Sequence, residues 1–238
     1  MKLAIISGGS KGLGEKLCEQ YLALDFEVIE FSRTAPHAYS VTIDLASAHN
    51  TSQIVSEALT PLAQREWQEI VVISNAGTLN PVGPVSKKDI ESVIASLNTN
   101  FVSGIVFMTE VLRYFQQHSG KKTLASISSG AALGERAGWS LYCAAKAGLE
   151  HFIRSVAKEQ DAESQPFKVV NVDPGLIDTG MQSVIRQSSI EDFPSLEQFK
   201  HRKDMGLLAS PIKVAEAIVR IIEISNAVNG ERIKVSFD

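Results

Sequence analysis

Hydrophobic residues along this chain form short runs rich in β-branched side chains, separated by longer segments with helical spacing. The runs occupy 3–7, 27–31, 40–43, 69–74, 123–128, 167–172 and 232–237. Runs of this length predict strands buried on both faces. Amphipathic helices are predicted near 13–24, 47–66, 87–118, 141–163 and 211–225. The alternation predicts an α/β fold, with one doubly wound parallel sheet and helices on both of its faces.

One long stretch, 174–211, lacks a regular hydrophobic pattern. Loops of this length inside a compact domain are usually functional or mobile, so we predict a substrate lid at about 176–210 with a short helix of its own. No internal repeat or linker divides the chain, and 238 residues suit one well-buried core. We therefore predict a single domain over residues 1–238.

Composition and charge exclude several classes of protein. The apolar fraction of 44% and the charged fraction of 21% are typical of a globular chain and exclude a disordered protein or a coiled coil. A formal net charge of −4 provides no basic surface for nucleic acid or an anionic membrane. The five histidines have no ligand spacing, so no metal site is predicted.

The cysteines and the first residues bear on location. Cys18 and Cys143 both lie in predicted helices, so we expect packing rather than a disulfide, which fits a reducing compartment. The apolar run at 3–7 is too short for a signal peptide or a membrane span. We therefore expect a soluble cytoplasmic protein.

The segment SGGSKGLG, residues 7–14, follows the first predicted strand and opens the first predicted helix. It places Gly8, Gly12 and Gly14 where the strand turns into the helix. In this context glycines let the backbone approach a pyrophosphate, and the helix N-terminus faces its charge. We predict a dinucleotide site, and the alternative is a tight turn without a ligand.

The end of the second predicted strand indicates which dinucleotide binds. An acidic residue about 20 positions past the glycines would bind the ribose 2′-hydroxyl of NAD, whereas a nearby arginine suits the 2′-phosphate of NADP. The chain has Ser32 and Arg33 there, and Lys11 in the glycine segment. We predict NADPH, because guanidinium and ammonium groups both bind phosphate. Glu30 lies on the same strand, and we expect it to be too deep to reach the ribose.

The stretch WSLYCAAKAGLE places Tyr142 and Lys146 four residues apart in a predicted helix. Residues at this separation share a helical face, so the two side chains can reach one site. A nearby positive charge favours phenolate, and we expect Lys146 to lower the tyrosine pKa from about 10 and to suit the pair for acid–base chemistry. The alternative is a packed tyrosine beside a solvated lysine.

Further motifs accompany this pair at spacings that resemble those of the short-chain dehydrogenase/reductase family. The resemblance covers nearly the whole chain and implies a Rossmann-type fold. It also implies that the matching segments bind NADPH. The cofactor segments are Gly8, Ser10, Lys11, Gly12, Leu13 and Gly14; Asp44-Leu45; Asn75-Ala76-Gly77; Tyr142 with Lys146; and Pro174-Gly175-Leu176-Ile177-Asp178-Thr179. This last stretch is similar to the segment that closes over nicotinamide in the family, and we call it the closing segment. Asn100 and Ser129 match positions of the family's active site.

The resemblance implies a carbonyl reductase with assigned roles for four residues. Tyr142 is expected to act as the general acid, and Ser129 to orient and polarise the carbonyl oxygen. Lys146 is expected to bind the nicotinamide ribose, and Asn100 to hold a water that links the lysine to solvent. Taken alone, Ser129 is equally compatible with a strand-end cap and Asn100 with a helix N-cap.

Segments 178–182, 191–199 and 207–218 resemble the sepiapterin reductase and bacterial benzil reductase group of this family. Sepiapterin reductases are expected to hold the pterin with an aspartate in the last strand, where this chain has Lys234. We therefore expect an aromatic or vicinal dicarbonyl substrate, with a pterin as the alternative. Leu133, Trp139 and Met181 are candidate walls of the substrate pocket, although each alone is compatible with ordinary packing.

Two other functions are compatible with the predicted fold. A nucleotide-sugar epimerase or dehydratase usually has a larger C-terminal domain, for which the residues after Gly175 leave no room. A redox-sensing protein that only binds NADPH would be expected to have lost Ser129, Tyr142 or Lys146. We therefore predict an enzyme.

The segment NFVSGIVFMTEVLRYF, residues 100–115, is apolar around most of a predicted helix. A surface helix needs only one apolar stripe, so such breadth indicates burial against the sheet and against a second element. In relatives, this helix packs against its own copy across a two-fold axis, and so does the helix that contains the tyrosine. We therefore predict a homodimer. The alternative is a helix that its own chain covers.

Overall fold

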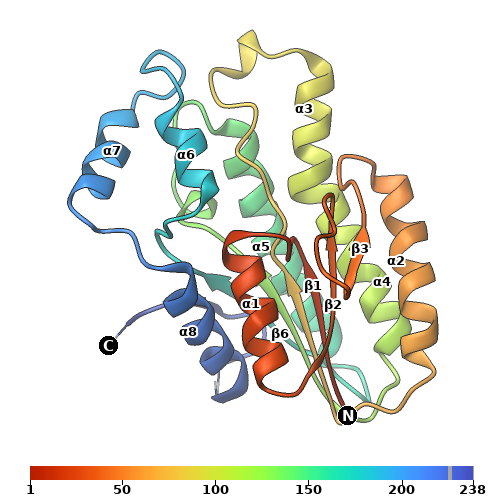
Figure 1. Cartoon of the computed structure of the whole chain (residues 1–238). Helices are drawn as coiled ribbons and strands as arrows, with labels where there is room; N and C mark the ends of the chain where they lie inside the picture. The colour runs from red at the N-terminus through yellow and green to blue at the C-terminus, as the bar shows by residue number, and fades with distance from the viewer. Residues whose placement is uncertain (225–226, 238) are drawn as a thin grey trace.

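A seven-stranded parallel sheet forms the centre of the molecule (Figure 1), and the computed structural model describes residues 1–224 and 227–237. The strands are β1 (Lys2–Ser7), β2 (Glu27–Ser32), β3 (Ser40–Thr42), β4 (Glu69–Ser74), β5 (Lys121–Ile127), β6 (Lys168–Asp173) and β7 (Arg232–Lys234). Neighbouring strands pair in parallel, in the order β3-β2-β1-β4-β5-β6-β7. The central strands are buried along nearly their whole length, which explains their continuous hydrophobic runs.

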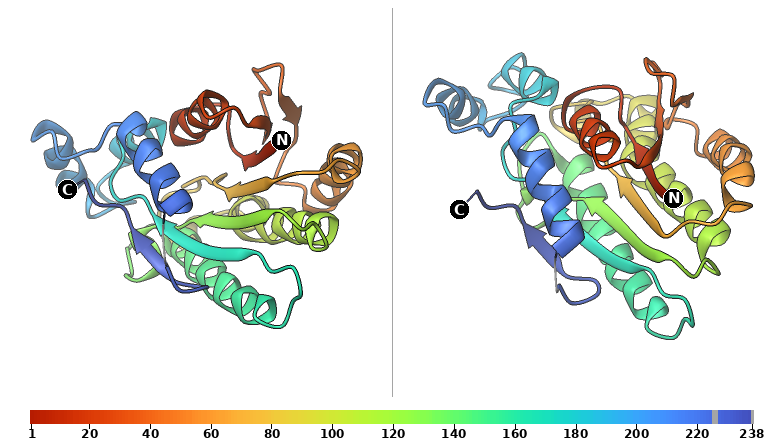
Figure 2. Two further views of the ribbon diagram at one scale, coloured as in Figure 1. Left: turned by 90° about the horizontal axis from the view of Figure 1, so that it is seen from below. Right: turned by 60° about the horizontal axis from the view of Figure 1, so that its bottom comes forward.

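Helices cover both faces of this sheet (Figure 2). They are α1 (Gly12–Ala23), α2 (Ala48–Ala63), α3 (Ile90–Leu97), α4 (Ser103–Phe115), α5 (Ser140–Gln160), α6 (Gly180–Arg186), α7 (Leu196–Asp204) and α8 (Pro211–Ile224). On one face α1 and α8 pack side by side and bury Leu17 and Ile218. On the other face α2, α4 and α5 bury Val55, Phe107 and Ile153. The predicted doubly wound α/β fold is confirmed.

The strand order reverses at β1, with β2 on one side and β4 on the other. In such sheets ligands bind outside the carboxyl ends of the strands at the point of reversal. Ser7 ends β1 and Ser74 ends β4, and these two residues pair in register. The glycine segment and Asn75 directly follow these ends. The topology therefore brings two of the predicted cofactor segments together.

A π-helical turn, Asn98–Val102, separates α3 from α4 within the predicted long helix. Such turns are rare inside helices and occur frequently at functional sites. Asn100, a predicted site residue, is buried in this turn. Because helical structure continues on both sides of it, Asn100 is not a helix N-cap, and the alternative interpretation of this residue is wrong.

The predicted lid contains two short helices where one was expected. α6 and α7 lie within 176–210 and project at the end of the molecule opposite the N-terminus (Figure 1). They have seven and nine residues, too few for a clear periodic pattern. The last strand is also shorter than predicted, with three residues. Residue 225, the predicted end of the last helix, lies outside the described residues.

Candidate active site

The glycine segment between β1 and α1 has the close packing that phosphate binding requires. Gly8 and Gly12 have φ angles of +76° and +61°, which favour glycine. A methyl group on Gly14 would lie 2.0 Å from the Gly8 carbonyl oxygen, so a side chain there would prevent α1 from starting this close to β1. The side chain of Lys11 does not cap α1, and the first N–H groups of the helix can bind an anion. Leu13 is buried beneath them. The segment therefore fits the phosphates of a dinucleotide.

Asn75 joins the end of β4 to the glycine segment. Its Nδ2 donates to the backbone oxygens of Ser7 and Gly8 at 3.3 and 3.0 Å, and its backbone N donates to the Ser7 hydroxyl at 3.1 Å. Ala76 lies directly against the same turn, because a methyl group on Gly8 would come within 2.8 Å of the Ala76 Cα. Ser10, in the same turn, is half-buried. These contacts hold the two predicted segments beside each other.

The end of β2 combines a buried acid with exposed cations. Glu30 is fully buried; its Oε2 accepts from the Gly9 N at 3.1 Å and its Oε1 from the Ser32 hydroxyl at 3.0 Å. Glu30 is thus too deep to reach a ribose, as expected. The Ser32 hydroxyl also accepts a backbone N–H, so it is already engaged. Lys11 and Arg33 are exposed, and within the described part of the chain neither side chain forms an ion pair or hydrogen bond.

Two further predicted segments border the same end of the sheet. Asp44 is exposed and Leu45 buried just after β3, and the Leu45 carbonyl oxygen accepts from the Ser103 hydroxyl at 2.7 Å. Thr179, which follows β6, approaches the glycine segment, because a methyl group on Gly12 would lie 3.5 Å from the Thr179 Cγ2. The predicted closing segment therefore reaches the glycine segment across the sheet.

Tyr142 and Lys146 share one face near the start of α5, as the spacing predicts. Lys146 Nζ lies 5.8 Å from the centroid of the Tyr142 ring. The two residues are only 7% and 4% exposed. Lys146 Nζ donates to the Ile127 carbonyl oxygen at 2.7 Å, which ties α5 to the end of β5. The lysine is therefore not solvated, and the alternative interpretation of the pair is wrong.

Burial has the largest effect on the pKa values of this pair. It raises the pKa of Tyr142 to about 12, and a hydrogen bond with Ser129 opposes the rise. Burial also lowers the pKa of Lys146 to about 8, and the negative charge of Glu150 opposes that change. The Tyr142 pKa therefore lies above 10 in this structure and not below it as expected from the sequence, because desolvation is the largest cause of the shift. A tyrosine with a raised pKa is protonated at neutral pH, which suits a general acid.

Ser129 combines a capping role with contact to the tyrosine. It precedes the 3₁₀ turn Gly130–Ala132, and its Oγ accepts from the Ala131 N at 3.2 Å. The Ser129 side chain also lowers the pKa of Tyr142 against the effect of burial, so it lies near the predicted general acid. Ser129 therefore has a capping contact, and it also lies where an active-site serine is expected.

The side chain of Asn100 positions the loop that follows β4. Its Oδ1 accepts from the Thr78 N at 2.7 Å, and its Nδ2 donates to the Thr78 oxygen at 2.9 Å. Gly77 lies against it, because a methyl group there would come within 3.2 Å of the Asn100 Oδ1. The predicted role of Asn100 in holding a water stays a prediction.

An aromatic cluster fastens the lid segment beside the catalytic pair. Trp139 stacks on Phe193 with ring centroids 4.8 Å apart and meets the edge of the Tyr142 ring at 5.9 Å. Phe199 of α7 packs on Trp139 at 5.4 Å. Phe193 and Phe199, which the sequence analysis did not single out, are buried. The cluster links the lid directly to the predicted general acid.

The remaining candidates for the pocket walls differ in their surroundings. Met181 packs against the aromatic cluster, whereas Leu133 is 70% exposed and lies outside it. At the base of the lid segment, Ile177 pairs with Ala209, and the Ala209 N donates to the Leu176 oxygen at 2.8 Å. The two ends of the segment are therefore joined beside the sheet.

A charged cluster behind Ser129 was not predicted from the sequence. Arg232 of β7 forms ion pairs with Glu150 of α5 and with Asp173 at the end of β6. The Asp173 Oδ1 also accepts from the Gly175 N at 3.1 Å, which fixes the turn that contains Pro174. Glu150 lies four residues after Lys146, and this helical spacing was the one available signal. Glu150 and Arg232 are 82 positions apart in the sequence, so no local pattern predicts their ion pair.

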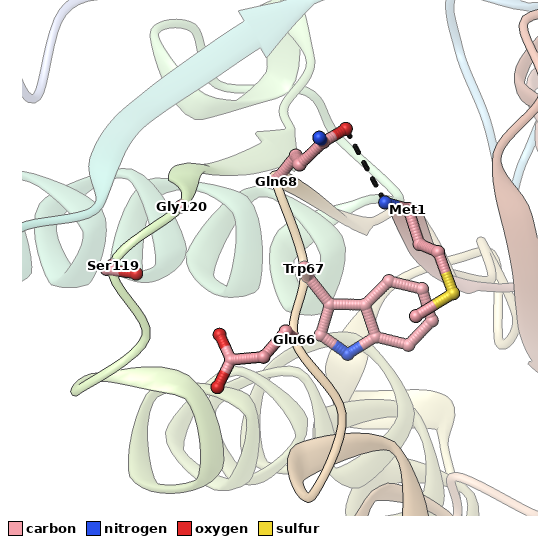
Figure 3. Close-up of a pocket in the computed structure, with 6 residues that line it drawn as sticks. All are labelled: Met1, Glu66, Trp67, Gln68, Ser119 and Gly120. Carbon is pink, nitrogen blue, oxygen red and sulfur yellow. Dashed lines mark hydrogen bonds between the residues drawn. The ribbon is translucent and has the colours of Figure 1, made fainter.

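A separate hollow of about 340 Å³ lies at the amino-terminal ends of β4 and β5 (Figure 3). Its lining residues are Met1, Glu66, Trp67, Gln68, Ser119 and Gly120. None of these belongs to the predicted site, which lies at the carboxyl ends of the strands. Among the described residues, no three side chains of the metal-ligating types come together. The hollow therefore lies at the opposite end of the strands from the predicted site.

Comparison with known proteins agrees with these motifs. The family model for short chain dehydrogenases matches residues 2–189. The chain is 32% identical to a benzil reductase ((S)-benzoin forming) of Bacillus cereus, over 99% of both chains. It is 33% identical to the protein of that description from Bacillus subtilis (strain 168), over 94% of both chains. A sepiapterin reductase of Bos taurus is 32% identical over 69% of this chain and 62% of its own length.

Solved structures share the fold. The crystal structure of the KRED1-Pglu enzyme has a TM-score of 0.83 at 24% identity, and the match covers 98% of this chain and 100% of that one. A short chain dehydrogenase from Burkholderia cenocepacia J2315 in complex with NADP has a TM-score of 0.76 at 20% identity, over 99% and 96% of the two chains. The chain belongs to the short-chain dehydrogenase family and is an oxidoreductase that acts on carbonyl or alcohol groups.

Proposed function

We propose that the chain is an NADPH-dependent reductase of aromatic or vicinal diketones, with a pterin carbonyl as the alternative substrate. The observation that supports this most is the buried Tyr142 side chain, which lies next to Lys146 and near Ser129. Asn75 and Thr179 bring the glycine segment to the same end of the sheet. A proton donor and a phosphate site are therefore combined in one place.

The residues of this chain perform the proton chemistry. When bound, the reduced nicotinamide supplies the hydride for the carbonyl carbon. Tyr142 Oη donates its proton to the carbonyl oxygen, which yields the alcohol, and the resulting phenolate regains a proton from solvent. The Ser129 hydroxyl donates a hydrogen bond to the same oxygen and polarises the carbonyl. Lys146, held by the Ile127 carbonyl, supplies positive charge that stabilises the transient phenolate.

Charge near the glycine segment favours NADPH. Lys11 and Arg33 are exposed cations without partners among the described residues, and both follow the ends of strands that flank the dinucleotide site. Glu30, the acid on the same strand, is engaged by Gly9 and Ser32. Two available cations and an engaged acid suit a 2′-phosphate better than a ribose hydroxyl.

Aromatic surroundings and relatives favour a diketone. The buried rings of Trp139 and Phe193 stack beside Tyr142, so the surroundings of the proposed proton donor are aromatic. Both Bacillus proteins that match the whole chain are described as benzil reductases. The position where a pterin reductase is expected to have an aspartate carries Lys234, which is exposed here. The pterin is therefore the second candidate.

A carbonyl panel tests the substrate class. Purified protein is mixed with NADPH and, in turn, benzil, an aromatic monoketone of similar size, sepiapterin and an aliphatic diketone, while the absorbance of the reduced nicotinamide is followed. We expect the highest kcat/KM with benzil. A higher value with sepiapterin would favour the pterin, and absence of oxidation with every carbonyl would favour a protein that only binds the cofactor.

A double substitution tests the cofactor preference. Lys11→Ala with Arg33→Ala should raise the KM for NADPH about 100-fold, because two charge-assisted contacts to the 2′-phosphate are lost. The KM for NADH should change little, because NADH lacks that phosphate. Lys213→Ala with Arg220→Ala, which removes two exposed cations from α8, is the matched control. An equal loss with both cofactors would contradict the preference for NADPH.

We also propose that the chain forms a homodimer through α4 and α5, as the resemblance implies, together with the apolar outer face of α3. Among the described residues, Ile90–Phe115 is the one helical run long and apolar enough to cross a membrane by length and composition, a test that core helices of other proteins also pass. Phe107 and Val111 face the sheet, whereas Ile90 and Ile94 are 66% and 52% exposed. An apolar outer face on a helix that already packs inward suits a second copy of the chain.

The cytoplasmic location inferred from the two cysteines and the first residues stays a prediction.

A further inference from the structure

The last strand brings one arginine to the place where three parts of the active site meet. Arg232 lies on β7, at the edge of the sheet beside β6 (Figure 2). Its Nη1 and Nη2 donate to the Ser129 carbonyl oxygen at 3.4 and 3.3 Å, and Nη1 donates to the Ser128 hydroxyl at 3.2 Å. The guanidinium therefore contacts the backbone of the active-site serine from behind.

Two carboxylates complete the contacts of this guanidinium. Glu150 Oε1 accepts from Arg232 Nη1 and from the Ser128 hydroxyl. Asp173 Oδ2 accepts from Nη2 at 2.7 Å, while its Oδ1 accepts from the Gly175 N at 3.1 Å. One planar group thus joins the serine turn after β5, the middle of α5, and the turn after β6 that leads to the closing segment.

The formal charges of the four ionisable side chains in this cluster sum to zero. Glu150 is one helical turn from Lys146 on α5, and Asp173 and Arg232 face it from β6 and β7. Two carboxylates and two cations therefore share a region that also contains the Tyr142 hydroxyl. Removal of Arg232 would leave two negative charges against one positive charge beside the catalytic pair.

Stability alone does not explain such a cluster. Glu150 and Asp173 are 2% and 5% exposed, and the Arg232 side chain is 19% exposed. Desolvation of buried ions offsets much of their attraction, and well-packed apolar residues often stabilise a fold as well or better. A guanidinium fixes the directions of several acceptors at once, because its N–H donors form a rigid fork. An apolar side chain has no donors and cannot do this.

We propose that Arg232 is a positioning residue of the active site, which sets the distance between the Ser129 turn and the helix that carries Tyr142 and Lys146. This role rests on the proposed carbonyl reduction, in which Tyr142 and Ser129 donate to one oxygen. A small displacement of reacting groups lowers the rate much more than it weakens binding. Arg232 acts through Ser129 and Glu150, and it does not itself touch the reacting atoms.

Arg232→Met and Arg232→Lys test this role, with Arg220→Met on the exposed face of α8 as the control. In Arg232→Met, kcat for the diketone should fall at least about 100-fold, while the Kd of NADPH should change less than about threefold. Arg232→Lys keeps the charge without the fork. It should recover the thermal stability of the wild type but leave kcat at least about tenfold lower. A merely structural role would let lysine restore both quantities.

Hydrogen exchange provides a readout that needs no turnover. The amides of Ala131, Ala132 and Gly175 donate to Ser129 and Asp173. In Arg232→Met they should exchange at least about tenfold faster, while β1 and β4 keep their protection. Arg220→Met should exchange like the wild type at all these positions.

Four results would overturn the proposal. They are an Arg232→Met variant that matches Arg220→Met in kcat and in exchange, a uniform loss of protection across the sheet, failure of both Arg232 variants to fold, and full recovery of kcat in Arg232→Lys. If the wild type reduces no carbonyl, the proposed function fails, and the exchange of the three amides then decides alone whether Arg232 positions these turns.

Discussion

Tyr142 and Lys146 have proton affinities that depend on how deeply α5 and the lid bury them. Their positions on a shared helical face follow from a spacing of four residues, so the sequence predicted the pair. The direction of the tyrosine pKa shift was mispredicted, because it depends on burial, to which Phe193 and Phe199, far away in the chain, contribute. Arg232 was missed for the same reason: its importance comes from partners on other strands and helices.

Stability at alkaline pH tests the burial of the lysine. Burial lowers the pKa of Lys146 from 10.5 to about 8, so between these pH values the unfolded chain binds one more proton than the folded chain. Stability should therefore rise with pH in this window, and the cost of the buried ammonium is fully present below it. Relative to Lys146→Met, the free energy of unfolding of the wild type should rise by about 2 kcal/mol between about pH 8 and about pH 9.5.

Urea unfolding of both proteins at the two pH values measures this difference. Tyr142 contributes little, because its pKa is 10.0 in the unfolded chain and about 12 in the folded one, so it is mostly protonated in both states over this range and is present in both proteins. All other groups are common to the two proteins. Equal changes in wild type and Lys146→Met would mean that the folded lysine keeps its ordinary pKa.

At the scale of elements, strands and long helices were predictable and short or interrupted elements were not. The seven hydrophobic runs correspond to the seven strands, because strands buried on both faces need continuous apolar sequence. The π turn at Asn98–Val102 has no periodicity that distinguishes it from helix. The helices α6 and α7 depend on packing against Trp139 rather than on their own pattern.

Docking of the lid segment through its aromatic residues can be tested by proteolysis. Phe193 is fully buried and stacks on Trp139, so Phe193→Ala should weaken the docking of α7. We expect trypsin to cut at Lys200, Arg202 or Lys203 at least about tenfold faster, because local opening becomes easier while the sheet stays folded. Mass spectrometry of the fragments identifies the cut.

The control for this experiment truncates a large apolar side chain that is exposed to solvent. Leu133 is 70% exposed and outside the aromatic cluster, so Leu133→Ala should be cut at the rate of the wild type. Equal cleavage of Phe193→Ala and Leu133→Ala would show that Phe193 does not hold the lid segment.

At the scale of the whole molecule, parallel topology collects segments from the entire sequence at one end of the sheet. The glycine segment, Asn75, Ser129 and the closing segment all follow carboxyl ends of strands. The alternation of strands and helices predicted this arrangement without any long-range information. Contacts between copies of the chain do not follow from it, because they depend on the outer face of helices.

Light scattering coupled to size exclusion tests the proposed homodimer. The mass should be about twice the 25.8 kDa of the chain, because the apolar outer face of α3 would otherwise lie in water. Ile94→Glu should give the mass of one chain, since it places a charge in that face. Ile212→Glu, at a site on α8 that is 47% exposed, is the matched control and should keep the larger mass. A wild-type mass near 25.8 kDa would reject the dimer.

Tyr142→Phe gives the most direct test of the central claim, that this chain reduces carbonyls with Tyr142 as the proton donor. The substitution removes the hydroxyl and keeps the ring that packs against Trp139. With benzil and NADPH both saturating, we predict that kcat falls about 1,000-fold while the Kd of NADPH is unchanged, because a general acid contributes about that factor. A kcat equal to that of the wild type would contradict the account and assign the proton to another group.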